Sequence, residues 1–366
     1  MPCQIQRYVN LQSANTLRLP AIAEYFVDVT DASALPEALQ FARDKELPMI
    51  VLGEGSNLVL GPKLPGLVIR MSSKGIARQG DRLTIAAGEN WHGLVMRSLD
   101  MGLYGLENLA LIPGTAGAAP MQNIGAYGAE LADVFHELTA LNRQTLETVR
   151  FSRADCGFGY RSSLFKTNGP QRFKTNEQQR FKTNGPQRFK ASEQQRWVIV
   201  DITLALSSKP SPSIGYQGLA EKLEQLGLAP EPKSVAQAVM ALRREKLPDP
   251  ATEPNAGSFF KNPCLTQTSV RRLREKFSDL PVYQAGGETR VSAAWLIEEA
   301  GLKGHQVGDA VMSARHALVL VNSGRATVTE VVGLASYVRS VVHEKFGMWL
   351  ELEPQAYHLF ADAPNY

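Results

Sequence analysis

Residues 105–128 read GLENLALIPGTAGAAPMQNIGAYG, and no other segment of the chain constrains the fold as strongly. Glycines and other small residues dominate its second half, so the segment cannot build a core from its side chains. Glycine lacks a Cβ atom, and its backbone can therefore lie close against a planar ligand. The composition predicts a ligand-binding loop, and a tight structural loop is the alternative.

A second glycine-rich turn, Gly53–Asn57 with the sequence GEGSN, directly follows the apolar run Met49–Leu52. The apolar run is typical of a buried strand. Backbone N–H groups of such a turn can bind a pyrophosphate, and Ser56 and Asn57 add further donors. The turn is not a Rossmann fingerprint, because Leu58 occupies the position of the third glycine. We interpret it as a phosphate-binding turn, with an ordinary β-turn as the alternative.

Periodicity in the first half of the chain predicts a mixed α/β domain. Apolar residues recur at helical spacing between Leu35 and Ala42, after Ser33 as the expected N-cap. The other elements expected in this half are strands at Leu67–Met71, Leu83–Ala87 and Val198–Leu206 and a helix at Trp91–Leu103. A strand, a helix and a strand followed by further strands are typical of an α/β fold.

The second half of the fold begins after the proline-rich segment Leu247–Pro254, which we expect to link two domains. A helix that contains Val235, Val239 and Leu242 should end before this linker. The elements expected beyond it are helices at Ser292–Ala300 and Val328–Phe346 and strands at Ala317–Val321 and Trp349–Glu353. Glycines at positions 301 and 347 are suited to end the two helices.

The length and composition are those of a soluble globular protein of two or three domains, with 366 residues, 44% hydrophobic and 20% charged. The three cysteines form no CxxC pair and the six histidines no HExxH motif, which argues against disulfides and against a metal site. We find neither a signal peptide nor an apolar run of about 20 residues that would cross a bilayer. We therefore expect a cytoplasmic protein without a membrane partner.

Residues 165–196 repeat one eight-residue unit four times: FKTNGPQR, FKTNEQQR, FKTNGPQR and FKASEQQR. The unit has no apolar period, so we expect an expanded, solvated loop between two strands. The first three units contribute a charge of +5 to the net charge of +3, which leaves −2 for the remaining chain. The overall charge therefore favours no nucleic-acid partner. Because Phe, Lys and Arg alternate in the unit, binding of nucleic acid is the alternative.

Two isolated side chains have the chemistry of a reactive site. Arg161 could pair with a carboxylate or stabilise developing negative charge, although such an arginine is often a surface residue. Ser258 is not in a GxSxG elbow, because Ala256 and Phe260 occupy the glycine positions. Between small and aromatic residues it could donate a proton, or it could be a turn serine bonded to its own backbone.

Glu351 and Glu353 are two residues apart on the predicted strand Trp349–Glu353, so their side chains should share a face. If that face points inward, at least one acid is buried and its protonation is perturbed. If it points outward, both acids are surface residues. The sequence alone leaves both possibilities open.

Taken in order, these segments resemble the UDP-N-acetylenolpyruvoylglucosamine reductase family, the flavoenzymes of bacterial peptidoglycan synthesis. The resemblance covers about residues 15–355. Its most specific stretches are LGEGSN, GLENLALIPG, QNIGAYG, FGYR, KLPDP, NAGSFFKNP and WLIEEAGLKG.

The resemblance implies an α+β protein with an FAD-binding fold of the vanillyl-alcohol-oxidase type and a C-terminal substrate-binding domain. It places the first α/β FAD-binding subdomain at 1–70 and the second at 71–247, with 165–188 as a repeat-expanded loop. The substrate-binding domain spans 248–346, and 347–366 forms a C-terminal strand that returns to the FAD-binding part.

The resemblance also implies the roles of individual residues. The catalytic residues are Arg161, Ser258 and Glu353, with Glu351 as the other possible acid. The residues that contact FAD are Gly53, Gly55, Ser56, Asn57, Leu58, Ile112, Pro113, Gly114, Thr115, Gln122, Asn123 and Gly125. The residues that bind substrate are Tyr216, of the family's longer tyrosine loop, Lys246 and Asn262.

The implied activity is the NADPH-dependent reduction of UDP-N-acetylglucosamine enolpyruvate to UDP-N-acetylmuramate. Hydride reaches the enolpyruvyl double bond through FAD, Arg161 and a protonated Glu353 stabilise the enolate, and Ser258 protonates the adjacent carbon. We expect a monomer. The alternatives are an FAD-dependent sugar or alcohol oxidase of the same fold and a non-catalytic interaction protein that acts through the basic repeat.

Overall fold

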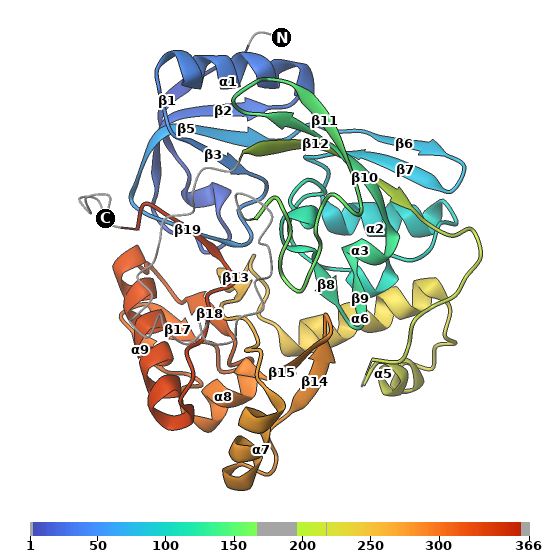
Figure 1. Cartoon of the computed structure of the whole chain (residues 1–366), viewed down its shortest axis with the longest axis vertical. Coiled ribbons are helices and arrows are strands. Elements are labelled where there is room, and N and C mark those ends of the chain that lie inside the picture. Colours follow the sequence, from blue (N-terminus) through green and yellow to red (C-terminus); the bar gives the residue numbers. More distant parts are fainter. Residues whose placement is uncertain (1–2, 167–195, 217, 360–366) are drawn as a thin grey trace. The chain divides into compact units, whose positions relative to one another are not determined.

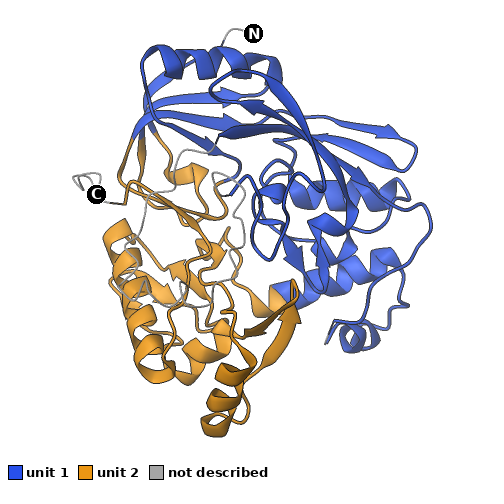
Figure 2. Ribbon diagram, in the orientation of Figure 1, with its two compact units in different colours: residues 1–9, 23–54, 65–243 blue, residues 10–22, 55–64, 244–366 orange. Residues whose placement is uncertain are grey.

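The computed structural model describes residues 3–166, 196–216 and 218–359. Of the predicted loop at 165–188 the structure describes only Phe165 and Lys166, and most of the repeats lie outside the described residues. The chain forms two compact units (Figure 2). The first comprises Met1–Val9, Ala23–Glu54 and Pro65–Arg243, and the second comprises Asn10–Ile22, Gly55–Leu64 and Arg244–Tyr366. The predicted ranges 1–70, 71–247, 248–346 and 347–366 do not coincide with these units, and as functional domains they stay a prediction.

The first unit begins with a four-stranded sheet in the order β1-β2-β5-β3. These strands are β1 (Gln6–Asn10), β2 (Ile22–Val29), β5 (Lys63–Met71) and β3 (Met49–Leu52). β3 and β5 are parallel, with Met49 opposite Leu67. Helix α1 (Leu35–Asp44) covers one face of this sheet (Figure 1) and buries Leu35, Leu39 and Ala42 in a shared cluster. The predicted helix between Leu35 and Ala42 and the predicted strands at Met49–Leu52 and Leu67–Met71 are confirmed.

The expected N-cap of helix α1 is wrong. A 3-10 turn, η2 (Ala32–Ala34), precedes the helix, and the Asp31 carboxylate accepts the Ser33 N–H at 2.9 Å. Asp31 therefore caps the turn and Ser33 lies inside it. A carboxylate can accept from the first orphan N–H groups as a serine hydroxyl does, so the two candidates compete.

The second sheet of the first unit is antiparallel, in the order β11-β10-β12-β7-β6. Its strands are β11 (Thr148–Ser152), β10 (Phe135–Asn142), β12 (Trp197–Ala205), β7 (Arg82–Ala86) and β6 (Ile76–Gln79). Helices α2 (Trp91–Asp100) and α6 (Pro232–Lys246) bury their apolar residues in one cluster with β7 and β12. The smaller elements of this unit are α3 (Leu131–Val134), α5 (Leu219–Gln225), β8 (Gly125–Ala126), β9 (Ala129–Glu130), η3 (Glu107–Leu109) and η4 (Ala119–Gln122).

The second unit has a four-stranded sheet in the order β13-β18-β17-β16. Its strands are β13 (Asn255–Ser258), β18 (Val319–Asn322), β17 (Ala310–Met312) and β16 (Gln306–Val307). The other elements are α7 (Gln267–Lys276), α8 (Ala293–Glu299), α9 (Val328–Phe346), the hairpin of β14 (Val282–Ala285) and β15 (Glu288–Val291), and η1 (Gln12–Ala14). The last strand, β19 (Gln355–Tyr357), pairs in parallel with β4 (Leu58–Leu60).

Helix α9 has the predicted bounds, Val328–Phe346. Thr327 and Glu330 form a reciprocal capping box at its start, which satisfies two N–H groups that the helix itself leaves without acceptors. Gly347 ends it in the left-handed region, with a φ of 74° that glycine adopts without strain. Neither this helix nor any other in the described ranges is long and apolar enough to span a membrane.

The predicted strand at Trp349–Glu353 is wrong. Only Leu352 pairs there, in a single antiparallel bridge with Phe260, and the strand lies further on at β19. A longer strand pairing would need two backbone groups that cannot take part in it. The Leu350 carbonyl accepts from the Arg339 side chain, and Pro354 has no N–H to donate.

Candidate functional site

Glu54 joins the two glycine-rich loops of the first unit. Its Oε1 accepts from Asn90 Nδ2 at 2.7 Å, and its Oε2 accepts from the Gly114 N–H at 3.1 Å. The loops are so close that a Cβ on Gly53 would lie 2.5 Å from Thr115 Oγ1. Sequence reasoning missed Glu54 as a site residue, because it assigned the GEGSN turn to its glycines and donors alone.

The segment after Pro113 lies with its backbone directly on another backbone. The Ala116 N–H donates to the Glu89 carbonyl and the Gly117 N–H to the Ala87 carbonyl, both at 2.8 Å. A Cβ on Gly117 would lie 2.5 Å from Ala87 Cβ, so no side chain fits at this position. The small residues of this stretch therefore allow close backbone packing, which is the feature of the tight structural loop that the sequence left as the alternative.

The remainder of the GEGSN turn, Gly55–Leu58, belongs to the second unit. Gly55 has a φ of 66°, and a Cβ there would lie 2.2 Å from the Ala14 carbonyl oxygen. The Asn57 carbonyl accepts from the Gln355 N–H at 3.0 Å, and Leu58 begins β4. The φ and the close approach to Ala14 require glycine at 55, and the bond between Asn57 and Gln355 holds the end of the turn.

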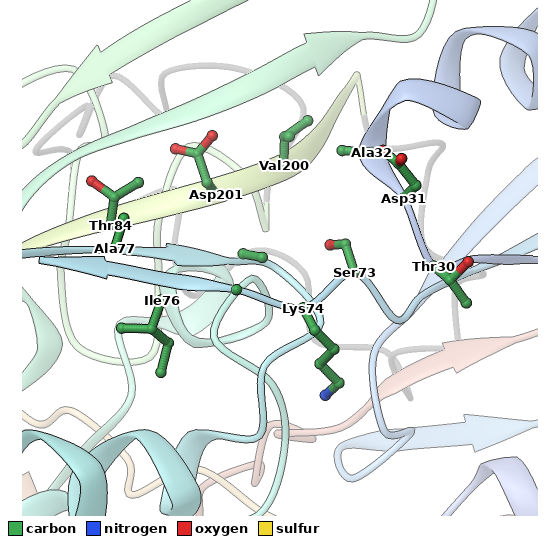
Figure 3. A pocket seen from close by; sticks show the side chains of 12 residues that line it. Thr30, Asp31, Ala32, Ser73, Lys74, Ile76, Ala77, Thr84, Val200 and Asp201 are labelled. Carbon is green, nitrogen blue, oxygen red and sulfur yellow. The ribbon is translucent and has the colours of Figure 1, made fainter. Parts of the chain in front are cut away.

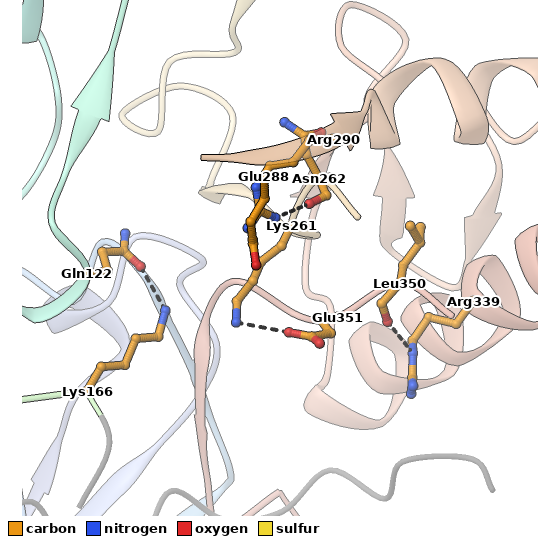
Figure 4. A network of polar contacts seen from close by, with 9 residues as sticks. All are labelled: Gln122, Lys166, Lys261, Asn262, Glu288, Arg290, Arg339, Leu350 and Glu351. Carbon is orange, nitrogen blue, oxygen red and sulfur yellow. Dashed lines mark hydrogen bonds and ion pairs between the residues drawn. The ribbon is translucent and has the colours of Figure 1, made fainter. Parts of the chain in front are cut away.

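Asn123 and Gln122 each hold part of the loop that contains them. Asn123 is 1% exposed, donates from Nδ2 to Glu130 at 2.7 Å and accepts the Ala132 N–H on Oδ1 at 2.9 Å. The Gln122 Oε1 accepts from Lys166 Nζ at 3.1 Å (Figure 4), a contact that fixes the orientation of the amide. Asn123 thus shapes the loop, and Gln122 presents an oriented amide.

Arg161 lies against the glycine loop of the same unit. Its Nη1 donates to the Gly125 carbonyl at 3.2 Å, and its φ is 51°. Burial lowers the pKa of Arg243, Tyr127 opposes that effect, and the positive charge of Arg161 lowers the pKa further. Two neighbouring guanidinium groups favour binding of an anion. The sequence offered Arg161 as a candidate but gave no reason to select Arg243.

Tyr216 packs on the same loop. Its ring meets that of Tyr127 edge-on, with centroids 5.1 Å apart and planes at 71°. The base of the tyrosine loop is tied by Asn108, whose Nδ2 donates to the Tyr127 carbonyl at 2.8 Å and the Ser213 carbonyl at 2.9 Å. The Tyr216 side chain is nevertheless 46% exposed. An exposed ring on an anchored loop is suited to cover a ligand.

The second unit places Ser258 and Glu353 on adjacent backbones. Ser258 pairs with Val319 at the end of β13, and the Glu353 N–H donates to the Phe259 carbonyl at 3.0 Å. Glu353 is buried, with 7% of its surface exposed, and Ser258 is half-buried. These are a hydroxyl and a buried carboxyl, the two group types that proton chemistry needs.

Glu351 and Glu353 do not share a face. Glu351 is exposed and pairs with Lys261 Nζ at 3.2 Å (Figure 4), whereas Glu353 is buried. The expectation of a common face failed because the segment is not a strand, so the alternation of side chains is lost. The environment of Glu353, and not that of Glu351, suits a group that acts in a water-poor site.

The other candidate substrate residues also lie in the second unit. Asn262 accepts the Ala293 N–H on Oδ1 at 2.9 Å at the start of α8, and its carbonyl accepts from Arg290 at 2.7 Å. Lys246 is exposed at the end of α6. Burial lowers the pKa of His316, and the positive charge of Lys246 lowers it further. Lys246 therefore lies near His316.

A hollow of about 600 Å³ opens elsewhere in the first unit. Figure 3 shows Asp31, Ser73, Thr84 and Asp201 among its lining residues. No predicted site residue lines it. Within the ranges that the structure describes, no group of three or more His, Cys, Asp or Glu residues could hold a metal ion.

Two family models match the chain. One, described as an FAD binding domain, matches residues 23–151. The other, described as the C-terminal domain of UDP-N-acetylenolpyruvoylglucosamine reductase, matches residues 249–357. Together with the mixed α and β elements, these matches confirm the predicted fold class.

Whole proteins give the same result. The UDP-N-acetylenolpyruvoylglucosamine reductase of Pseudomonas putida is 41% identical over 98% of this chain and 100% of its own length, and that of Pseudomonas aeruginosa is 42% identical with the same coverage. The crystal structure of the reductase from Thermus caldophilus is 25% identical and covers 97% of this chain and 99% of its own, with a TM-score of 0.65.

Proposed function

The chain belongs to the UDP-N-acetylenolpyruvoylglucosamine reductase family, and from this premise we propose that Arg161, Ser258 and Glu353 are its catalytic residues. It is an FAD-dependent oxidoreductase of peptidoglycan precursor synthesis. It uses NADPH to reduce UDP-N-acetylglucosamine enolpyruvate to UDP-N-acetylmuramate. The predicted function and cofactors are confirmed, in preference to the oxidase and the non-catalytic alternatives.

The glycine-rich loops fit FAD. At Gly53 and Gly117 a Cβ would collide with Thr115 or Ala87, so no side chain at these positions stands between the loops and a ligand. FAD, when bound, supplies the hydride-transfer chemistry of the reaction. The residues that would hold it are Gly53, Gly55, Ser56, Asn57, Leu58, Ile112, Pro113, Gly114, Thr115, Gln122, Asn123 and Gly125.

Arg161 and Glu353 stabilise the negative charge that builds on the substrate carboxylate during reduction. A guanidinium can donate two parallel hydrogen bonds to a carboxylate, and a protonated Glu353 can donate one more. The Gly125 carbonyl accepts a hydrogen bond from Arg161 and helps to orient its guanidinium group. Burial of Glu353 strengthens the hydrogen bond that its carboxyl can donate.

Ser258 supplies the proton that completes the reaction. Hydride adds to the terminal carbon of the enolpyruvyl double bond, and the electron pair moves towards the carboxylate. The Ser258 O–H bond then breaks, and a C–H bond forms at the carbon that carries the ether oxygen. The observation that carries this assignment is the backbone pairing that places Ser258 beside Glu353, in a chain matched over 98% of its length.

Tyr216, Lys246 and Asn262 bind the nucleotide part of the substrate. The exposed Tyr216 ring covers the uridine diphosphate from its anchored loop. Lys246 offers its ammonium to the phosphates, which are anions. We further propose that the protein acts as a cytoplasmic monomer, for which light scattering of the purified protein is the test.

Purified protein tests the function directly. A yellow preparation should be bleached by NADPH and recover its colour only when the enolpyruvyl nucleotide is added. Peroxide release from a free sugar would support the oxidase instead. Colourless protein with salt-sensitive binding to nucleic acid would support the non-catalytic alternative.

A further inference from the structure

Backbone hydrogen bonds hold one side of the segment 350–353 in the second unit. The Glu353 N–H donates to the Phe259 carbonyl at 3.0 Å, and the Lys261 N–H donates to the Glu351 carbonyl at 2.8 Å. These two bonds flank the bridge between Leu352 and Phe260. They fix the spacing of the two backbones, but each backbone segment is short and needs support from elsewhere.

A buried arginine holds the same segment from helix α9. Arg339 is 5% exposed, and its Nε donates to the Leu350 carbonyl at 2.8 Å (Figure 4). Leu350 is itself fully buried and lies three residues before Glu353. Only Glu351 and Leu352 lie between this contact and the acid, so the contact restrains the backbone close to Glu353.

The indole of Trp349 strengthens this attachment. The Arg339 guanidinium lies over the Trp349 ring, with Cζ 5.4 Å from the centroid. His343, one helical turn further along α9, stacks on the same indole with centroids 4.1 Å apart and planes at 13°. Two side chains of α9 thus contact Trp349, the residue that precedes Leu350.

A cation is a costly way to fill this position. Burial lowers the pKa of Arg339, and the charge of Glu351 only partly opposes that effect. An apolar side chain of similar volume would pack there without the loss of hydration, so packing alone does not explain the residue. The guanidinium adds a directed hydrogen bond to Leu350 and a contact with the Trp349 ring, and both partners belong to the segment that leads to Glu353.

We propose that Arg339 is a positioning residue that acts through Glu353, by fixing where the Glu353 carboxyl stands relative to the Ser258 hydroxyl. This inference rests on the proposed function, in which those two groups act on the substrate. A carboxyl displaced by about 1 Å can lower the rate of a chemical step about 10²-fold. The effect should fall on substrate reduction and not on flavin reduction by NADPH.

Stopped-flow measurement of the two half-reactions tests the proposal. Arg339→Met should leave flavin reduction by NADPH within about twofold of the wild type and slow reduction of the nucleotide about 10²-fold. Arg339→Lys should recover part of this loss, because an ammonium can still donate to Leu350. Arg325→Gln, which removes an exposed arginine of the same unit, is the matched control and should change neither step.

A double-mutant cycle with Glu353→Gln separates positioning from a general structural role. If Arg339 acts through Glu353, Arg339→Met should slow nucleotide reduction by no more than about twofold in the Glu353→Gln background. Hydrogen exchange of a peptide that covers 349–355 should accelerate in Arg339→Met, while peptides of α9 keep their protection. If Arg339→Met does not fold, Arg339→Lys enters the same cycle.

Multiplicative losses, equal losses in both half-reactions, or no loss would overturn the proposal. A wild-type protein that fails to reduce the nucleotide would instead refute the proposed function. A fully active Glu353→Gln variant would refute the assignment of Glu353, and this inference with it. If Glu353→Gln is impaired, and Arg339→Met slows it by the same factor as the wild type, only the inference about Arg339 fails.

Discussion

The glycine-rich loops of the first unit and the Ser258–Glu353 region of the second unit are held by different interactions. At Gly117 the absence of a side chain lets one backbone lie on another. Near Glu353 the chain is held by a large, charged side chain, that of Arg339. The first arrangement should be damaged by any added atoms, and the second only by loss of particular functional groups. Substitutions in the two regions can test this difference.

The largest effect is expected from Ser258→Ala. Loss of a proton donor should slow reduction of the enolpyruvyl nucleotide about 10³-fold, the usual range for a general acid, and spare flavin reduction by NADPH. Stopped-flow absorbance of the flavin follows both steps. Ser340→Ala, on the exposed surface of α9, is the control. Equal losses in both steps would give Ser258 another role.

Gly117→Val should damage the loop region without touching any reactive group. Its Cβ would meet that of Ala87 at 2.5 Å, and overpacking of this kind costs about 1–3 kcal/mol of unfolding free energy. We expect a lower melting temperature and weaker retention of FAD. Gly93→Ala is the matched control, because its Cβ would meet nothing closer than Asn90 Oδ1 at 3.4 Å. A stable, fully loaded Gly117→Val protein would refute the backbone-packing account.

Glu351→Gln should have a small effect, in contrast to Glu353→Gln. Glu351 is exposed, and surface ion pairs such as that with Lys261 contribute about 0–1 kcal/mol. The turnover number of Glu351→Gln should stay within about threefold of the wild type. If steady-state kinetics showed the greater loss in Glu351→Gln, Glu351 would become the catalytic acid.

The smallest effect concerns Cys156 in the core of the first unit. Burial, with the charge of Asp155, raises the pKa of its thiol to about 12. The folded protein therefore holds this proton more tightly than the unfolded chain, whose thiol titrates near 9.0. The associated stability is complete below that pH and is lost as the pH rises towards 12. Urea unfolding at pH 8 and pH 10.5 should show a smaller decline in Cys156→Ala than in the wild type.

The sequence was most informative where structure depends on local composition. The glycines of Gly53–Asn57 and 105–128 predicted two ligand-binding loops, with a β-turn and a tight structural loop as the alternatives, and the periodicity of Val328–Phe346 predicted α9 with its bounds. For α9 the deciding contacts, the capping box of Thr327 and Glu330 and the turn at Gly347, lie within a few residues of the helix ends. Such patterns carry the physical constraint in the segment itself.

The sequence was least informative where distant side chains decide the local structure. The alternation in Trp349–Glu353 predicted a strand, but the Leu350 carbonyl is engaged by Arg339, eleven residues earlier. Glu54 and Arg243 were missed because their partners, among them Asn90 and Tyr127, are remote in sequence. The catalytic roles predicted for Arg161, Ser258 and Glu353 come from the resemblance to a family and not from the spacing of these residues.

The second unit is built from both ends of the chain, and this has a consequence for synthesis on the ribosome. Asn322 donates to the Leu17 carbonyl across a separation of 305 residues, and β19 pairs with β4. Residues 10–22 and 55–64 therefore emerge long before the strands that complete their pairing. The nascent chain should expose them until Asn322 and β19 have been synthesised, which makes them natural binding sites for a chaperone.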